Sequence, residues 1–86
     1  MAIYQVIIKE TAQKQIKKLP NDYLTKVKAA ILKLQQNPRP VGCKKLVGSN
    51  NIYRIRVGIY RIVYEIIDKQ LIVYIFDVEH RKDVYR

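Results

Sequence analysis

The sequence predicts an α+β fold of two layers, in which an N-terminal strand and an antiparallel helical hairpin pack on a mainly antiparallel, twisted sheet. Two observations lead to this prediction. Apolar residues recur at helical spacing in the first half of the chain, and they alternate with polar residues in the second half, where a Gly-Ile pair separates two alternating stretches. Because the chain has 86 residues, we expect residues 1–86 to form a single small domain.

A strand and a short helix are expected at the start of the chain. Ile3–Ile8 is an apolar run rich in β-branched residues, which predicts a first strand that is largely buried rather than exposed at an edge. Ala12, Ile16 and Leu19 then recur at the spacing of one helical stripe, which predicts a helix over Ala12–Leu19. Thr11 can cap this helix.

A second helix is expected after a short turn. Pro20 interrupts the first helix, and Asn21 or Asp22 can cap a second helix that runs to about Gln36. Pro38 ends it, because the residue before a proline disfavours helix. The turn is so short that the two helices must lie antiparallel, with lysine-rich outward faces.

Residues Ile52–Tyr64 predict the β-hairpin around which the rest of the chain is organised. Gly58 and Ile59 form a two-residue turn, and glycine in the first place suits a type II′ turn. Arg56 then faces Arg61 across the hairpin. The face directed to the core carries Tyr53, Ile55, Val57, Tyr60, Ile62 and Tyr64, and the other carries Ile52, Arg54, Arg56, Arg61, Val63 and Glu65. Like charges opposite each other destabilise a sheet, so these arginines indicate a function.

Two further strands complete the predicted sheet. Lys44–Val47 is a candidate short strand, and a turn at Asp68-Lys69 leads into a long strand over Gln70–Val78. If this turn has two residues, Leu71, Val73 and Ile75 join the core, while Ile72, Tyr74 and Phe76 lie beside the arginines. A register shift of one residue would exchange the two sets. Residues 77–86 are read as a tail.

The charge of the chain predicts a polyanionic or acidic partner. The net charge is +10, and residues 44–61 contain five cationic residues and no anionic ones. For the lysines of the helices, an ordinary solvated surface is an equal alternative. No apolar run approaches the ~18 residues that would span a membrane, and we find no signal peptide. Cys43 is the single cysteine, which fits a reducing compartment, so we expect a cytoplasmic protein without a membrane partner.

Several kinds of chemistry can be set aside, and no cofactor or metal is expected. One cysteine and one histidine cannot fill a tetrahedral zinc site. Asp77, Glu79 and His80 could suggest a metal site, but we interpret them as solvated tail residues. Cys43 has no base beside it in sequence, so we interpret it as a small packing residue.

The remaining candidates can bind and cleave a phosphodiester. Arginine binds phosphate through two parallel hydrogen bonds and never loses its charge, which suits Arg54, Arg56 and Arg61 to this task. Lys44 and Lys45 can add phosphate contacts. A proton-transfer group is also needed, and His80 has a better intrinsic pKa for it than Tyr85. Tyr85 could instead be a terminal aromatic side chain that docks on the sheet.

These residues resemble the RelE family of toxins. The matching segments are Tyr-Arg-Ile-Arg-Val-Gly-Ile-Tyr-Arg-Ile-Val-Tyr-Glu-Ile (53–66) and Val-Glu-His-Arg-Lys-Asp-Val-Tyr (78–85), and the likeness covers nearly the whole chain. By this resemblance Arg61 matches a conserved catalytic arginine, Arg81 falls on or next to a second one, and Tyr85 matches a tyrosine that stacks on or activates the substrate. Arg54 and Arg56 stand where relatives carry lysines. An arginine cannot act as a base, so proton abstraction would shift to Tyr85 or His80.

The resemblance also implies a function and partners. It implies a toxin of a type II toxin–antitoxin system that enters the ribosomal A site and cuts mRNA there by 2′-hydroxyl attack, without a metal ion. It implies an acidic cognate antitoxin, and binding to operator DNA only as the toxin–antitoxin complex.

Two other functions remain open from the sequence. ParE-like toxins share the fold, inhibit DNA gyrase without cutting RNA, and also tend to end in a His/Arg/Asp cluster such as residues 80–83. Tyr85 and the opposed Arg56 and Arg61 are instead expected of the RNA-cutting toxins. A basic RNA- or DNA-binding module without catalysis would rest on net charge alone.

Overall fold

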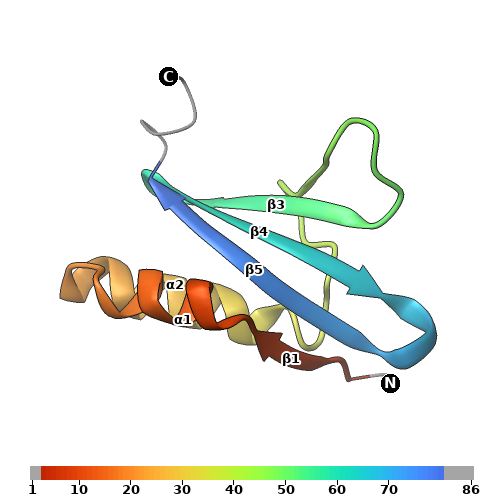
Figure 1. Ribbon diagram of the computed structural model, residues 1–86, viewed down its shortest axis with the longest axis horizontal. Helices are drawn as coiled ribbons and strands as arrows, with labels where there is room; N and C mark the ends of the chain where they lie inside the picture. Colours follow the sequence, from red (N-terminus) through yellow and green to blue (C-terminus); the bar gives the residue numbers. More distant parts are fainter. Residues whose placement is uncertain (1–2, 81–86) are drawn as a thin grey trace.

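The computed structural model describes residues 3–80, which form a mixed five-stranded sheet with two helices on one face (Figure 1). The strand order is β1-β5-β4-β3-β2. In chain order the elements are β1 (Gln5–Ile8), α1 (Glu10–Lys17), α2 (Asn21–Lys33), β2 (Lys44–Lys45), β3 (Ile52–Val57), β4 (Tyr60–Ile67), the 3-10 turn η1 (Asp68–Gln70) and β5 (Ile72–His80). The predicted two-layer α+β architecture is confirmed.

The two helices lie side by side, as expected, but their ends differ from the prediction. α1 begins at Glu10, with Lys9 rather than Thr11 in the N-cap position. α2 begins at Asn21 after Pro20 and ends at Lys33, short of Gln36. Acidic residues in the first turns and lysines in the last turns stabilise both helix dipoles, which explains these ends without a capping side chain.

The prediction of a largely buried first strand is wrong. β1 lies at the edge of the sheet and pairs in parallel with β5, from Gln5 opposite Ile72 to Ile8 opposite Ile75. Ile3 is 64% exposed and Ile7 is 38% exposed. An apolar run alone cannot distinguish a central strand from an edge strand of which only one side is covered.

The predicted hairpin is confirmed residue by residue. β3 and β4 pair from Ile52 opposite Glu65 to Val57 opposite Tyr60. Gly58 has a φ of +61°, and Ile59 keeps a negative φ, as a type II′ turn requires. β2 is shorter than the predicted Lys44–Val47 strand, since only Lys44–Lys45 pair with β3.

The turn before the last strand is longer than the two residues predicted. η1 and Leu71, which has a φ of +55°, separate β4 from β5. Leu71 is therefore 39% exposed and does not join the core, whereas Val73 and Ile75 are fully buried as predicted. The two extra residues preserve the inward and outward alternation, so Ile72 and Tyr74 lie on the predicted side.

A β-bulge changes this alternation further along β5. Tyr64 faces Ile75, but Val63 faces Asp77, so Phe76 is an extra residue without a partner on β4. From the bulge onward Val78 is buried in the core, and β5 continues to His80. Residues 77–80 therefore belong to the sheet, and reading them as a solvated tail is wrong.

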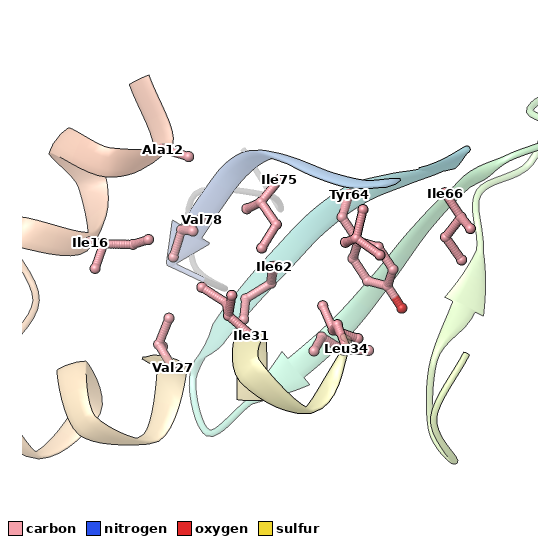
Figure 2. Close-up of a cluster of buried hydrophobic side chains, with 12 residues drawn as sticks. Ala12, Ile16, Val27, Ile31, Leu34, Ile62, Tyr64, Ile66, Ile75 and Val78 are labelled. Atoms are coloured by element: carbon pink, nitrogen blue, oxygen red, sulfur yellow. The ribbon is translucent and has the colours of Figure 1, made fainter. Parts of the chain in front are cut away.

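The core lies between the helices and one face of the sheet. Figure 2 shows Ala12, Ile16, Val27 and Leu34 of the helical layer directed toward the sheet side chains. The buried sheet residues are Ile55, Ile62, Tyr64, Ile66, Val73, Ile75 and Val78. Each fully buried aliphatic side chain of this kind contributes about 1.5–3 kcal/mol.

A polar cluster centred on Arg39, the Arg39 cluster, connects four distant segments. Arg39 Nη2 donates to Asp68 Oδ2 at 2.8 Å, and Arg39 Nε donates to the Tyr53 hydroxyl at 3.2 Å. The Tyr4 hydroxyl donates to Asp68 Oδ1 at 2.6 Å. The hydrogen bonds from Arg39 and Tyr4 lower the pKa of the Asp68 carboxyl. The cluster thus joins the chain start, the loop after α2, η1 and β3.

Candidate nucleic-acid interface

The sheet face turned away from the helices carries the predicted arginines, and we call it the arginine face. It is defined by Lys44, Arg54, Arg56 and Arg61. The register places Arg56 opposite Arg61 and Lys44 opposite Arg54, and alternation directs all four side chains away from the core. Lys45 stands opposite Tyr53 and so points to the other face. The sequence placed the three arginines together correctly.

Arg61 is the most unusual of these residues, because it is buried. Its side chain is 6% exposed, although the residue lies outside the hydrophobic core. Its buried Nε atom has no hydrogen-bond partner among residues 3–80. A buried donor without a partner is costly, and a cation opposite another cation adds to that cost. Arg61 and Arg56 therefore form a prepared site for an anion.

A carboxylate that sequence reasoning missed completes the row. Glu79 of β5 lies opposite Arg61, so Arg56, Arg61 and Glu79 follow one another across three strands. Without the bulge, Val78 would occupy this place. The only signal in the sequence is the charge of Glu79 itself, because a bulge leaves no clear local pattern.

His80 lies on the opposite face from the arginines. It stands opposite Tyr60, and the two rings make an edge contact with centroids 5.3 Å apart. Tyr60 in turn contacts Tyr23 of α2 edge-on at 5.0 Å. His80 thus lines a hollow of about 360 Å³ together with Gln15 and Leu19 of the helical layer. The expectation that His80 joins the arginine row is not met, because the bulge reverses its direction.

A side chain of α1 bonds to the edge of β5 that faces away from β4. β1 stops pairing at Ile8, so the edge of β5 is open beyond Ile75. Gln15 of α1 fills this place: its Oε1 accepts from the Val78 N–H, and its Nε2 donates to Asp77 Oδ1, both at 2.7 Å. The amide of Gln15 thereby fixes the segment of β5 just before Glu79, the residue that stands opposite Arg61.

Two aromatic side chains lie beside the arginine row, as the sequence predicted. Tyr74 stands opposite Glu65, which puts it on the arginine face. Phe76 stacks on Tyr74, with ring centroids 6.4 Å apart and planes inclined by 27°. Arg81 and Tyr85 lie outside the described residues.

The arrangement is suited to binding phosphate. Rigid strands hold guanidinium groups in a row, and preorganised charge of this kind stabilises negative charge that develops in a transition state. Within the described part of the chain, no three His, Cys, Asp or Glu side chains are grouped to hold a metal ion. No helix of residues 3–80 is long and apolar enough to cross a membrane.

Comparison with known proteins gives a consistent family. Residues 6–85 match the model of the ParE toxin of the type II toxin–antitoxin system parDE. Toxin RelG of Mycobacterium tuberculosis is 36% identical over 96% of this chain and 97% of its own. The mRNA interferase toxin RelE of Escherichia coli K12 is 30% identical over 88% of this chain and 83% of its own. The archaeal RelE–RelB complex from Pyrococcus horikoshii contains a chain with a TM-score of 0.83 and 27% identity, which covers 94% of this chain and 97% of that one.

Proposed function

Because the chain belongs to the RelE/ParE superfamily of toxins from type II toxin–antitoxin systems, we propose that it is a ribosome-dependent mRNA endonuclease. It would enter the ribosomal A site and cut the mRNA codon there. The buried Arg61 opposite Arg56 is the observation that carries the proposal. A relative named as an mRNA interferase, 30% identical, supports the same activity.

The proposed reaction needs no metal ion. The substrate 2′-hydroxyl gives up its proton as its oxygen forms a bond to the adjacent phosphorus, the bond from phosphorus to the 5′-oxygen breaks, and the leaving 5′-oxygen takes up a proton, so that the products are a 2′,3′-cyclic phosphate and a 5′-hydroxyl. Arg61 stabilises the charge on the phosphoryl oxygens, and Arg54, Arg56 and Lys44 hold neighbouring phosphates. We assign proton transfer to Tyr85, with Arg81 as a second cation, on the resemblance of residues 78–85 to the family. His80 faces the helices, so we give it no part in proton transfer.

An acidic antitoxin is the proposed protein partner, and operator DNA would be bound only by the toxin–antitoxin complex. The solved RelE–RelB complex and the net charge of +10 support this. Ile8, Ile16, Ile31 and Leu32 line an apolar hollow of about 230 Å³ on the helical side, with Lys28 at its border. An acidic amphipathic helix matches such a surface in both shape and charge. With ribosomes as the target, the proposed place of action is the cytoplasm.

Mapping mRNA 5′ ends after induction in cells tests the proposal. Cuts in phase with the reading frame are expected for the wild-type chain. Arg61→Ala should cripple cleavage, whereas Lys17→Ala on the helical surface should barely change it. Equal losses in the two variants would indicate diffuse charge rather than a site.

The role of Tyr85 is tested separately. Tyr85→Phe should remove most cleavage and toxicity while the circular dichroism spectrum and the unfolding midpoint stay the same, because only a hydroxyl is lost. Full cleavage by this variant in primer extension would exclude Tyr85 as the proton-transfer group.

Gyrase inhibition is the second candidate, because the family model that matches residues 6–85 is that of a ParE toxin. The same induction experiment separates the two functions. Intact mRNA together with arrested DNA replication would support gyrase inhibition and contradict RNA cleavage.

A further inference from the structure

Tyr74 and Phe76 are two large aromatic residues that do not contribute to the hydrophobic core. Both rings are half-buried and lie on the arginine face, on the far side of the sheet from α1 and α2. Within residues 3–80, neither belongs to the hydrophobic core or to the partly buried side chains packed against it. Two large aromatic rings that stack beside the core rather than within it indicate a binding surface.

The bulge in β5 creates this pair. Phe76 is the extra residue of the bulge, so it has no partner on β4 and lies next to Tyr74 at 6.4 Å with nearly parallel rings. The next row contains Val63, whose side chain is buried on the same face. The two rings therefore lie over or beside the buried Val63, and together these side chains make an apolar patch next to the charged residues of the arginine face.

The position of the rings relative to Arg61 is the decisive feature. Phe76 lies at the bulge beside Val63, about 7 Å along the strand from Arg61, and Tyr74 lies opposite Glu65, about 13 Å along the strand from Arg61. One ribonucleotide can therefore place its phosphate at Arg61 and its base on the Phe76 ring, with the Tyr74 ring stacked beside it. Glu65, which stands opposite Tyr74, accepts a hydrogen bond from Asn51 Nδ2 at 2.7 Å.

We propose that Tyr74 and Phe76 form a stacking platform for one RNA base next to the phosphate held by Arg61. The proposal rests on the RNA-cutting function proposed above and identifies an additional RNA-binding site on the same face. Aromatic side chains that reach the surface of a sheet bind single-stranded RNA bases by stacking. Every base has a π-face, so the platform adds affinity without selecting a codon.

The test measures binding of the full chain to programmed ribosomes whose A-site codon carries 2′-deoxynucleotides, so that the RNA cannot be cut. Phe76→Leu and Tyr74→Leu keep apolar area but remove the stacking face, and Phe76→Tyr and Tyr74→Phe retain it. We expect the leucine variants to bind roughly five- to 150-fold more weakly, the effect of one stacked base. The two ring-retaining variants should bind like the wild type.

A double-mutant cycle with abasic RNA makes the test specific. Removing one base of the codon should weaken binding of the wild-type chain as much as Phe76→Leu does, and should have no further effect on that variant. Equal losses from the abasic site in the wild type and in Phe76→Leu would overturn the platform. Unchanged RNA affinity together with weakened antitoxin binding would also overturn it, in favour of a protein-binding surface.

The outcomes for the platform and for the proposed function can be told apart. In-phase cleavage by the wild type without any base-dependent coupling to Phe76 would refute the platform and leave the nuclease standing. Base-dependent coupling without cleavage would support the platform as an RNA-binding site and refute the nuclease. Urea unfolding of each leucine variant shows whether a change in binding comes from a change in folding.

Discussion

Replacing Arg61 by methionine should increase stability and abolish function together. The buried Nε without a partner costs about 1–3 kcal/mol, and the opposed Arg56 adds about 0.2–1 kcal/mol of repulsion. Methionine has a similar length and removes both penalties, but it also removes the cation opposite Glu79, which offsets about 0.2–1 kcal/mol of the gain. We therefore expect Arg61→Met to raise the free energy of unfolding by about 1–3 kcal/mol, and to remove mRNA cleavage.

Urea unfolding followed by circular dichroism measures the first effect, and primer extension on induced cells measures the second. Arg56→Met is the matched control. The exposed side chain of Arg56 takes part in the repulsion with Arg61 but has no buried donor, so this variant should raise the free energy of unfolding by only about 0.2–1 kcal/mol. A loss of stability of more than about 1 kcal/mol in Arg61→Met would refute the reasoning, since Arg61 would then be a structural cation rather than one held ready for phosphate.

Three other substitutions test the surroundings of the site. Gly58→Ala should lower the free energy of unfolding by about 2–3 kcal/mol, because the left-handed backbone disfavours a Cβ and that atom would meet Tyr23 Cε1 at 2.6 Å. Gly48→Ala is the control for the backbone effect alone, since Gly48 has a φ of +82° and open space around it. Equal losses of stability in the two variants would show that the contact with Tyr23 contributes nothing. The lowered pKa of Asp68 stabilises the fold above the unfolded pKa of ~3.9, and this stability is lost as the pH falls through the lower folded value. Asp68→Asn should therefore flatten the acid side of a plot of urea midpoint against pH, and an unchanged slope there would contradict the role of the Arg39 cluster. Leu32→Asp, at a side chain that is 62% exposed, should weaken calorimetric binding of an acidic antitoxin without lowering stability, whereas the exposed Ala29→Asp, outside the hollow, should weaken it less.

The hairpin could be predicted from the sequence because two independent signals agreed on it. Alternation assigned each residue of β3 and β4 to a face, and Gly58 set the register through its turn. The arginine row followed directly from that register. The helices were predictable in number and direction, whereas their ends depended on charge near the first turns rather than on capping side chains.

The end of β5 could not be predicted, because its direction depends on one inserted residue. Phe76 has no partner on β4, and this alone exchanges the faces of Glu79 and His80. Neither residue type marks a bulge. The exposed edge position of β1 was equally hidden, since pairing between the two ends of a chain leaves no local pattern in either strand.

That pairing has a consequence for how the toxin is made. Gln5 of β1 pairs with Ile72 of β5, so β1 must wait for a strand that is synthesised much later before the sheet can close. Synthesis proceeds at about 5–20 residues per second, and through that interval the nascent chain lacks both β5 and its pairing with β4. The row of Arg56, Arg61 and Glu79 therefore assembles only after β5 has been synthesised, so the site does not exist on a nascent chain that still lacks this strand.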